Sequence, residues 1–185
     1  DNTDSNGAYV GGILGYNNTN DSFATTLTNV HFTGIVVAAD DSWSAGGLIG
    51  ENGGNATITN SSNTGSVSGG DSTDYVGGLV GETWGATLNI INSFNSGNVS
   101  AKGNACCVAG IIGEVQQATL NNVYNTGSVT GFAYVGGLIG FIFTSATVQN
   151  SYSSGAINGN DAPTTGALIG EPYDSATITL LNNYW

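Results

Sequence analysis

The sequence has almost no positive charge. One lysine, Lys102, stands against 13 aspartates and glutamates, which gives a net charge of 1 − 13 = −12. Nucleic-acid binding needs a surface that neutralises many phosphates, so this composition excludes it, and it also excludes charge-driven binding to anionic lipid. No apolar run approaches the roughly 18–20 residues that span a bilayer. We therefore expect neither a nucleic-acid partner nor membrane insertion.

Histidine and cysteine are also scarce. His31 is the only histidine and there is no arginine, so a zinc site or a histidine-based catalytic triad is very hard to assemble. We expect no catalytic residue and no enzyme activity. Cys106 and Cys107 are the only cysteines and are adjacent, which is not a disulfide framework. A disulfide between them, a link to an unknown partner and two reduced thiols all stay open, and an extracellular location favours oxidation.

What the sequence does have is a repeated phrase. The six copies start at intervals of 35, 31, 32, 27 and 30 residues, four of them having two glycines and two of them an alanine in place of one glycine. They are Gly11–Gly15, Gly46–Gly50, Gly77–Gly81, Ala109–Gly113, Gly136–Gly140 and Gly166–Gly170. A repeat near 30 residues is typical of solenoid proteins, in which each unit buries its apolar side chains against its neighbours.

Two further phrases follow in each unit. The first is an Ala-Thr pair with a β-branched or leucine residue after it, as in Ala56-Thr57-Ile58, and the second begins with asparagine, with glycine five residues later in the first five units. Each unit thus holds about three short β-rich segments bounded by Gly, Asn and Ser turns, and no helical period is present. We predict an all-β fold, a three-faced, right-handed β-solenoid (β-helix) of about six coils.

We expect one domain, 1–185, with repeats at approximately 8–43, 44–74, 75–106, 107–133, 134–164 and 165–185. Stacking of coils would place like residues over like, about 4.8 Å apart. The recurring asparagines would then form a structural stack whose side-chain amides bond along the axis and satisfy polar groups buried at a corner. This stack comprises Asn29, Asn60, Asn92, Asn122, Asn150 and Asn182.

These repeats resemble the GLUG motif of large bacterial and archaeal surface proteins, including adhesins. The form Tyr-Val-Gly-Gly-Leu-Val-Gly followed by Ala-Thr and Asn-Ser-Phe-Asn-Ser-Gly is clearest in Tyr75–Val99 and recurs in Tyr134–Ile157. The closing Asn183-Tyr184-Trp185 resembles a phrase found at the end of such arrays. The resemblance implies a β-solenoid and an extracellular or cell-surface location, and it does not imply an enzyme.

Several acidic residues are candidates for chemistry. Glu51, Glu82, Glu114 and Glu171 each follow the first phrase directly. The first three lie in consecutive units, and as a stacked row they would repel one another unless splayed, protonated or bridged by a cation. We expect solvated side chains at a turn, with weak cation binding and a glycosidase carboxylate pair as alternatives. Asp71 and Asp74, with Asp40–Asp41 one coil earlier, are weak candidates for a Ca²⁺ site; otherwise we expect no cofactor.

The polar surface suggests two further roles. Sequons at Asn17, Asn20, Asn55 and Asn98 are predicted glycosylation sites, whereas Asn60 is expected to be bare because it lies in the stack. A file of outward threonines at 57, 87, 119, 147 and 177 is the feature an ice-binding surface would need, although β propensity explains it as well. His31 shares its slot with aromatic residues of other units, which predicts an aromatic stack.

The ends of the array bear on assembly. The chain opens with Asp1, has no basic and apolar leader, begins its first coil after seven residues and stops inside its sixth. We expect a processed product or an excised segment, continued by neighbouring repeats of a longer chain or by head-to-tail stacking on itself. The predicted function is that of an extracellular structural or adhesive protein, and a glycosylated filament subunit is one form it could take. Carbohydrate or ice binding is the alternative, and glycoside cleavage is the third hypothesis.

Overall fold

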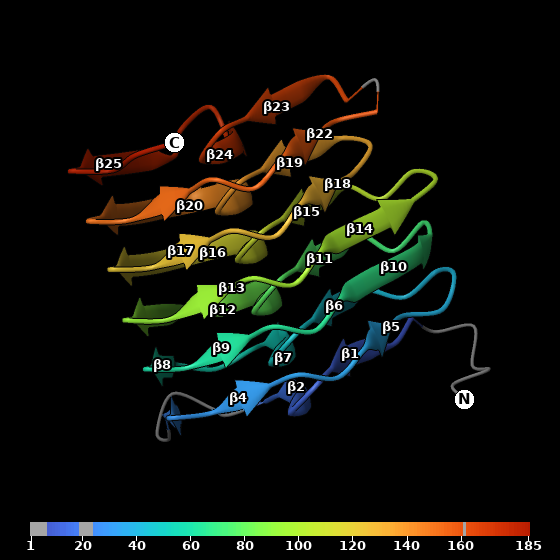
Figure 1. Ribbon diagram of the computed structural model, residues 1–185, viewed down its shortest axis with the longest axis horizontal. Coiled ribbons are helices and arrows are strands. Elements are labelled where there is room, and N and C mark those ends of the chain that lie inside the picture. Colours follow the sequence, from blue (N-terminus) through green and yellow to red (C-terminus); the bar gives the residue numbers. More distant parts are fainter. Residues whose placement is uncertain (1–6, 19–23, 161) are drawn as a thin grey trace.

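A computed structural model describes residues 7–18, 24–160 and 162–185. Parallel β-strands from successive repeats pair with one another, so the chain winds as a β-solenoid of about five turns, and the prediction of a β-solenoid is confirmed. The first and last coils lie at opposite ends of the stack (Figure 1). The described residues form no helix, so none is long and apolar enough to cross a membrane.

The described strands form four sheets, one more than the three faces predicted, and the last coil contributes no strand to sheet D. The additional strand arises because the first phrase folds back on itself at its glycines and gives one strand before the bend and one after it. Sheet A contains the strands before the bend: β1 (Tyr9–Gly11), β6 (Ser44–Gly46), β11 (Tyr75–Gly77), β15 (Cys107–Ala109), β19 (Tyr134–Gly136) and β23 (Thr164–Gly166).

Sheet B contains the strands after the bend together with the Ala-Thr segments, which are continuous with them in the middle coils. Its strands are β2 (Leu14–Asn17), β3 (Thr25–Thr28), β7 (Ile49–Asn52), β8 (Ala56–Thr59), β12 (Val80–Ile91), β16 (Ile112–Asn121), β20 (Ile139–Gln149), β24 (Ile169–Pro172) and β25 (Thr177–Leu181). It is the longest sheet of the solenoid and carries most of the large buried side chains.

Two narrower sheets complete the coil. Sheet C consists of β4 (His31–Phe32), β9 (Ser62–Asn63), β13 (Phe94–Asn95), β17 (Tyr124–Asn125) and β21 (Tyr152–Ser153). Sheet D consists of β5 (Val36–Val37), β10 (Val67–Asp71), β14 (Val99–Lys102), β18 (Val129–Thr130) and β22 (Ile157–Asn158).

The interior is divided into two apolar cores. One contains the large side chains of sheet B and of the bend, such as Leu48 and Ile58, and the other contains small β-branched residues of sheets A and D, such as Val76 and Val67. The bend lies against sheet C and leaves no room for a side chain. A Cβ atom on Gly47 would lie 2.6 Å from the Asn63 side chain and 2.2 Å from the carbonyl oxygen of Gly78. Glycine is therefore required there for close approach of the backbones.

The corner between sheets B and C determines the register of the coils. Asparagine occupies this corner with a φ of 50 to 57°, which asparagine tolerates better than most residues. Residues at the same distance before the corner asparagine pair with one another, so Leu88 pairs with Ala56 and Ile178 pairs with Ala146. The Ala-Thr phrases of the third and sixth coils are thus shifted by two residues from the alignment that their sequence suggests.

Candidate functional site

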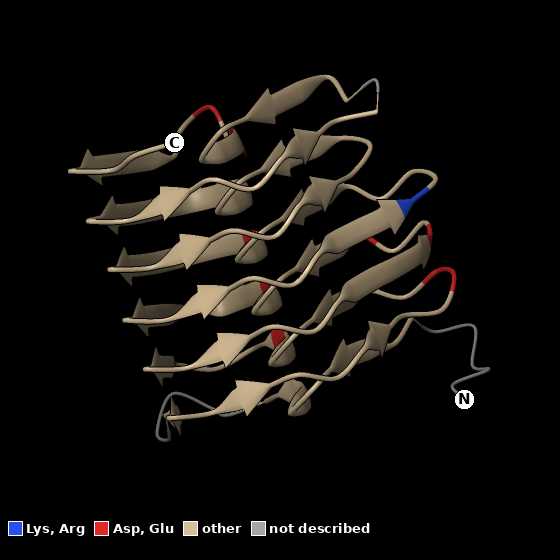
Figure 2. Ribbon diagram, in the orientation of Figure 1, with Lys and Arg blue, Asp and Glu red and all other residues tan. Residues whose placement is uncertain are grey.

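The glutamate row lies inside the molecule. Glu51, Glu82 and Glu114 are in register on β7, β12 and β16, and only 7%, 6% and 6% of their surfaces are exposed. Figure 2 shows these acidic positions one above another in successive coils. The expectation of solvated side chains at a turn is wrong, because sheet B continues past the glycine and sheet A folds beside it.

Burial and mutual repulsion make these carboxyls hard to ionise. The pKa of Glu82 is raised to about 8 by burial and then by the charges of Glu51, Glu114 and Asp74. Burial raises the pKa of Glu114 to about 7, against an opposing hydrogen bond from Tyr75. Burial also raises the pKa of Glu51, and a hydrogen bond from Tyr9 again opposes it. Around neutral pH the row therefore holds protons that an exposed glutamate would have lost.

A row of tyrosines on sheet A supplies those hydrogen bonds. Tyr9, Ser44, Tyr75, Cys107 and Tyr134 follow one another in register. A hydrogen bond from Tyr9 acts on Glu51 and one from Tyr75 acts on Glu114; in both pairs the glutamate belongs to the following coil. By this pattern the partner of Glu82 is Ser44, whose side chain is far shorter. The Ser44 hydroxyl oxygen is fully buried and has no hydrogen-bond partner.

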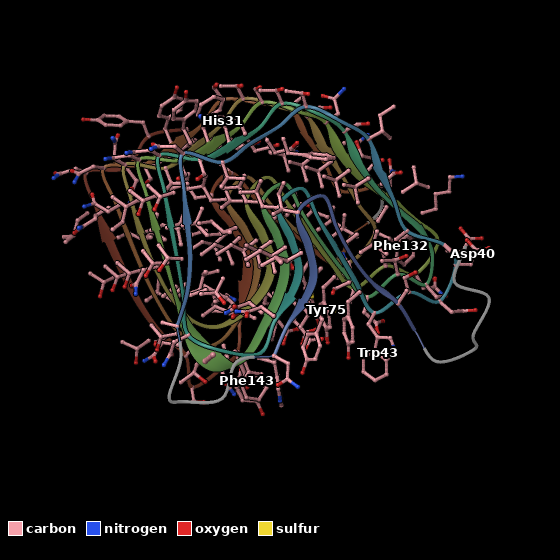
Figure 3. All side chains as sticks on the ribbon, turned by 90° about the horizontal axis from the view of Figure 1, so that it is seen from below. His31, Asp40, Trp43, Tyr75, Phe132 and Phe143 are labelled. Carbon is pink, nitrogen blue, oxygen red and sulfur yellow. The ribbon has the colours of Figure 1, made fainter. Side chains whose placement is uncertain are left out.

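A cavity of about 300 Å³ opens where the tyrosine is missing. Four aromatic side chains (Tyr9, Trp43, Tyr75 and Trp84) and three carboxyl groups (Glu51, Glu82 and Asp74) line it. Tyr75 and Trp43 project next to each other from this side of the solenoid (Figure 3). The Trp43 and Trp84 side chains are 48% and 51% exposed, so the cavity opens to solvent between them.

A second hollow, of about 200 Å³, is uncharged. It is lined by backbone and small polar side chains around Asn55, Thr87 and Gln117. The Thr87 hydroxyl donates a 2.8 Å hydrogen bond to the Gln117 side chain there. With no titratable group in its lining, this hollow offers no acid, base or nucleophile.

The predicted calcium residues are not grouped. Asp74 lines the cavity, whereas Asp71 is the exposed last residue of β10, where its backbone N–H donates a 2.8 Å bond to the Asp40 carboxylate. Among the residues that the structure describes, no three or more His, Cys, Asp or Glu side chains are close enough to hold a metal ion.

The two cysteines lie against each other in the tyrosine row. Their sulfur atoms are 2.8 Å apart as thiols; Cys107 is fully buried and Cys106 half-buried. Burial raises the pKa of Cys107, while the hydrogen bond from Cys107 lowers the pKa of Cys106. Cys106 is therefore the thiol that ionises first.

The predicted asparagine stack is at the surface. All six of its members are exposed at the left-handed corner. Asn122 donates a 2.8 Å bond to Asn92, and Asn182 donates a 3.3 Å bond to Asn150. Asparagine recurs in every coil because it tolerates the left-handed backbone conformation of the corner. Since these side chains are exposed, the expected role of satisfying buried polar groups does not apply to them.

A different set of asparagines satisfies the buried polar groups. Asn63, Asn95 and Asn125 are fully buried, and each amide donates to the carbonyl oxygen of the glycine two residues later. Asn63 also donates to Asn95, and Asn95 to Asn125. The sequence analysis missed this ladder. Its signal is the recurring Asn-Thr/Ser-Gly at residues 63–65, 95–97 and 125–127.

The predicted glycosylation sites differ in accessibility. Asn55 and Asn98 are exposed, with oxygens that accept hydrogen bonds from Thr87 and Ser128. Asn17 is only 5% exposed and its amide nitrogen donates a 2.6 Å bond to Asn52, so the expectation of a glycan there is wrong. Asn20 lies outside the described residues.

Two rows of side chains repeat along the outer surface, one aromatic and one mostly threonine. The rings of Phe94, Tyr124 and Tyr152 stack at 4.8 and 5.0 Å with planes 2° and 3° apart, so they cover one another's faces. His31, in the same slot, bonds to the Ser62 hydroxyl at 2.8 Å. The threonine file predicted at 57, 87, 119, 147 and 177 forms with two other members. The register aligns Thr57, Thr119 and Thr147 with Thr26 and Thr179, and Asn89 interrupts the file between Thr57 and Thr119.

Comparison with known families agrees with this architecture. A family model of the GLUG motif matches residues 41–68, a segment that contains β6 to β9 and the start of β10 and includes both Ser44 and Glu51. No curated protein and no solved structure matches the chain. The resemblance inferred from the repeats is confirmed over this segment: residues 41–68 of the solenoid are a GLUG motif.

Proposed function

We propose that this chain is a structural and adhesive element of an extracellular or cell surface, and that its terminal coils stack end to end on further copies. The proposal is carried by the last coil. Leu180 pairs in register with Val148, which is fully buried, yet Leu180 itself is 50% exposed. A further coil of the same design would cover it as β25 covers Val148.

A second copy is a suitable occupant because the solenoid repeats its own edge. The first coil has free parallel strand edges, such as that of β1, at the opposite end of the stack from the last coil. Open edges of parallel strands are templates for pairing, and head-to-tail contact of this kind produces a fibre. Neighbouring repeats of a longer chain would satisfy the same edges.

The surface chemistry supports an extracellular location. Only 8% of residues are charged, and exposed asparagines at sequons 55 and 98 would accept glycans. Stacked coils with long uncharged sides give a rod that displays the same side chains at regular intervals, which suits adhesion through many weak contacts.

A binding role is better supported than cleavage of a glycoside. A retaining glycosidase needs one carboxyl ionised as nucleophile and another protonated as acid, on opposite sides of the bond. Here the three glutamates face the same way on one sheet, and burial raises the pKa of each of them. We therefore propose no enzyme activity.

Sedimentation velocity and negative-stain imaging over a concentration series test the assembly. We expect rods that lengthen with concentration, and shortening of these rods in Leu180→Asp, which places a charge on the stacking face. Phe132→Asp, at a 42% exposed side chain of a middle coil, is the matched control and should assemble normally. A monodisperse 18.6 kDa species at all concentrations would overturn the proposal.

A further inference from the structure

The acidic cavity exists because of one residue in the tyrosine row. Tyr9 and Tyr75 lie on either side of Ser44 in neighbouring strands, and side chains in register on a parallel sheet point the same way. Ser44 therefore points to the same side as the two rings that line the cavity. A tyrosine at this position would fill the space and donate to Glu82, as its neighbours do to Glu51 and Glu114.

Where the ring is missing, Ser44 and Glu82 both lack the tyrosine–glutamate contact of the neighbouring coils. The buried Ser44 hydroxyl oxygen has no hydrogen bond. Glu82 lies in the centre of the row and is the member of the cavity that receives no tyrosine hydrogen bond, in contrast to Glu51. A carboxyl group that is buried beside other carboxyl groups is stabilised in its ionised form by a nearby positive charge, so this site favours a cationic ligand.

The lining defines the chemistry of that ligand. Three carboxyl groups and four aromatic rings surround the space, and no cationic side chain lines it. Acidic groups beside the faces of tryptophan and tyrosine are the surroundings that organic ammonium groups favour, through charge and cation–π attraction. A metal ion fits less well, because the carboxyls of the described residues do not converge into a metal-binding group and the cavity measures about 300 Å³.

We propose that the cavity between Trp43 and Trp84 binds an organic ammonium group, with the positive charge held by Glu51 and Glu82 and the alkyl groups against the aromatic rings. Tyr9, which packs against Trp43 with ring centres 6.3 Å apart, forms one wall of the site. Trp84, which packs against Phe143 at 5.8 Å, forms another. The natural source of the group is a lysine side chain of a partner protein or a free amine.

Binding of this cation should depend on pH. The groups that face Glu82 are Glu51, Glu114 and Asp74, all acidic, and the Tyr9 and Tyr75 rings, whose pKa values are raised. A cation stabilises the ionised form of Glu82, whose pKa is about 8 without one. Below that pH, binding must displace a proton, so affinity falls as the pH is lowered from about 9 to about 6.

Isothermal titration with tetramethylammonium and with butylammonium tests the site. Tetramethylammonium carries no ionisable proton, so its pH dependence reports on the protein alone. We expect both to bind, with affinity about tenfold or more higher at pH 9 than at pH 6 for tetramethylammonium. tert-Butanol, neutral and of similar shape, and methyl glucoside should bind at least tenfold more weakly, in keeping with a charge-selective cage.

Two variants distinguish a loss of binding in the cavity from a loss of folding. Ser44→Tyr restores the ring that Tyr9 and Tyr75 carry, so it should abolish binding and leave the circular dichroism spectrum and melting curve those of a folded solenoid. Glu82→Gln should weaken tetramethylammonium at least tenfold at pH 9 and flatten its pH dependence. Glu171→Gln, in the same row but outside the cavity, is the matched control and should bind normally.

The outcomes separate the sources and the alternatives. Tighter binding of a short peptide with trimethylated lysine than of tetramethylammonium identifies a protein side chain as the ligand, and equal affinity identifies a free amine. Equal binding of tert-butanol or the glucoside, binding of Ca²⁺ in place of the ammonium ions, or undiminished binding by folded Ser44→Tyr would each overturn the proposal.

Discussion

The Asn63 amide nitrogen donates a 2.9 Å hydrogen bond to the amide oxygen of Asn95 in the next coil, and both side chains are fully buried. Asn95 repeats the bond to Asn125 at 2.9 Å. Each amide also donates to the carbonyl oxygen two residues ahead, so a single column of side chains holds sheet C against the next coil and closes the turn after it.

Removal of the central amide should therefore destabilise the solenoid strongly. Asn95→Ala leaves the Asn63 amide, the Asn125 oxygen and the Gly97 carbonyl each short of a partner in the interior. We expect a loss of about 3 kcal/mol in the free energy of unfolding, at a cost of roughly 1–3 kcal/mol per unsatisfied group with partial relaxation. Urea unfolding followed by circular dichroism measures it.

The control for this variant is Asn104→Ala, because Asn104 is exposed in the loop after β14. We expect its stability to change by no more than about 0.5 kcal/mol. Similar losses for the buried and the exposed asparagine would show that the ladder contributes nothing specific.

The exposed corner asparagines should be sensitive to the backbone and insensitive to their amides. Asn92 has a φ of 50°, which glycine adopts freely and a β-branched residue does not. Asn92→Val should cost about 1–2 kcal/mol, whereas Asn92→Gly should be within about 0.5 kcal/mol of the wild type. Thermal melts of the two variants distinguish them; equal melting temperatures would contradict a left-handed corner.

Stability should decrease as the pH rises. The folded-state pKa values of Glu82 (about 8) and Glu114 (about 7) lie above the ordinary 4.5, so the folded protein binds more protons than the unfolded chain between those values. By linkage, the free energy of unfolding falls from pH 4.5 to about 8, by an amount on the order of a few kcal/mol. Urea unfolding at pH 5 and pH 8.5 measures the difference.

Glu82→Gln should remove much of this pH dependence, because glutamine keeps the shape and cannot ionise. Glu171→Gln removes the same formal charge from the end of the row and serves as the comparison. If the two variants lose the same share of the slope, net charge and not the buried row is responsible.

Glycosylation should follow accessibility and not the sequence motif. Expression in a host that adds N-linked sugars should give glycans on exposed Asn55 and Asn98 and none on Asn17, whose amide nitrogen is used in the bond to Asn52. Mass spectrometry of glycopeptides identifies the occupied sites. A glycan on Asn17 would be incompatible with the buried pair.

The sequence by itself was sufficient to predict the solenoid and the GLUG resemblance. Identical phrases at about 30-residue spacing have one simple physical solution, in which each coil pairs with the next, and the asparagine corner keeps its place in every coil because its backbone conformation is local. The aromatic slot was also predictable, since Phe94 and Tyr124 lie at the same distance from that corner.

Only the tertiary structure decided which recurring residues are inside. In the sequence, Glu82 directly follows a recurring glycine and Asn98 directly precedes a recurring apolar residue, so the two look alike. Glu82 is nevertheless buried, because sheet A folds beside it, whereas Asn98 is exposed because no described segment folds over it. The asparagine corner, several residues away, determines that Leu88 pairs with Ala56, whereas the Ala-Thr phrase next to Leu88 suggests a different alignment. Burial depends on which segments lie across from one another, and a one-dimensional period carries no record of that; the gap at Ser44 becomes a cavity solely through this packing.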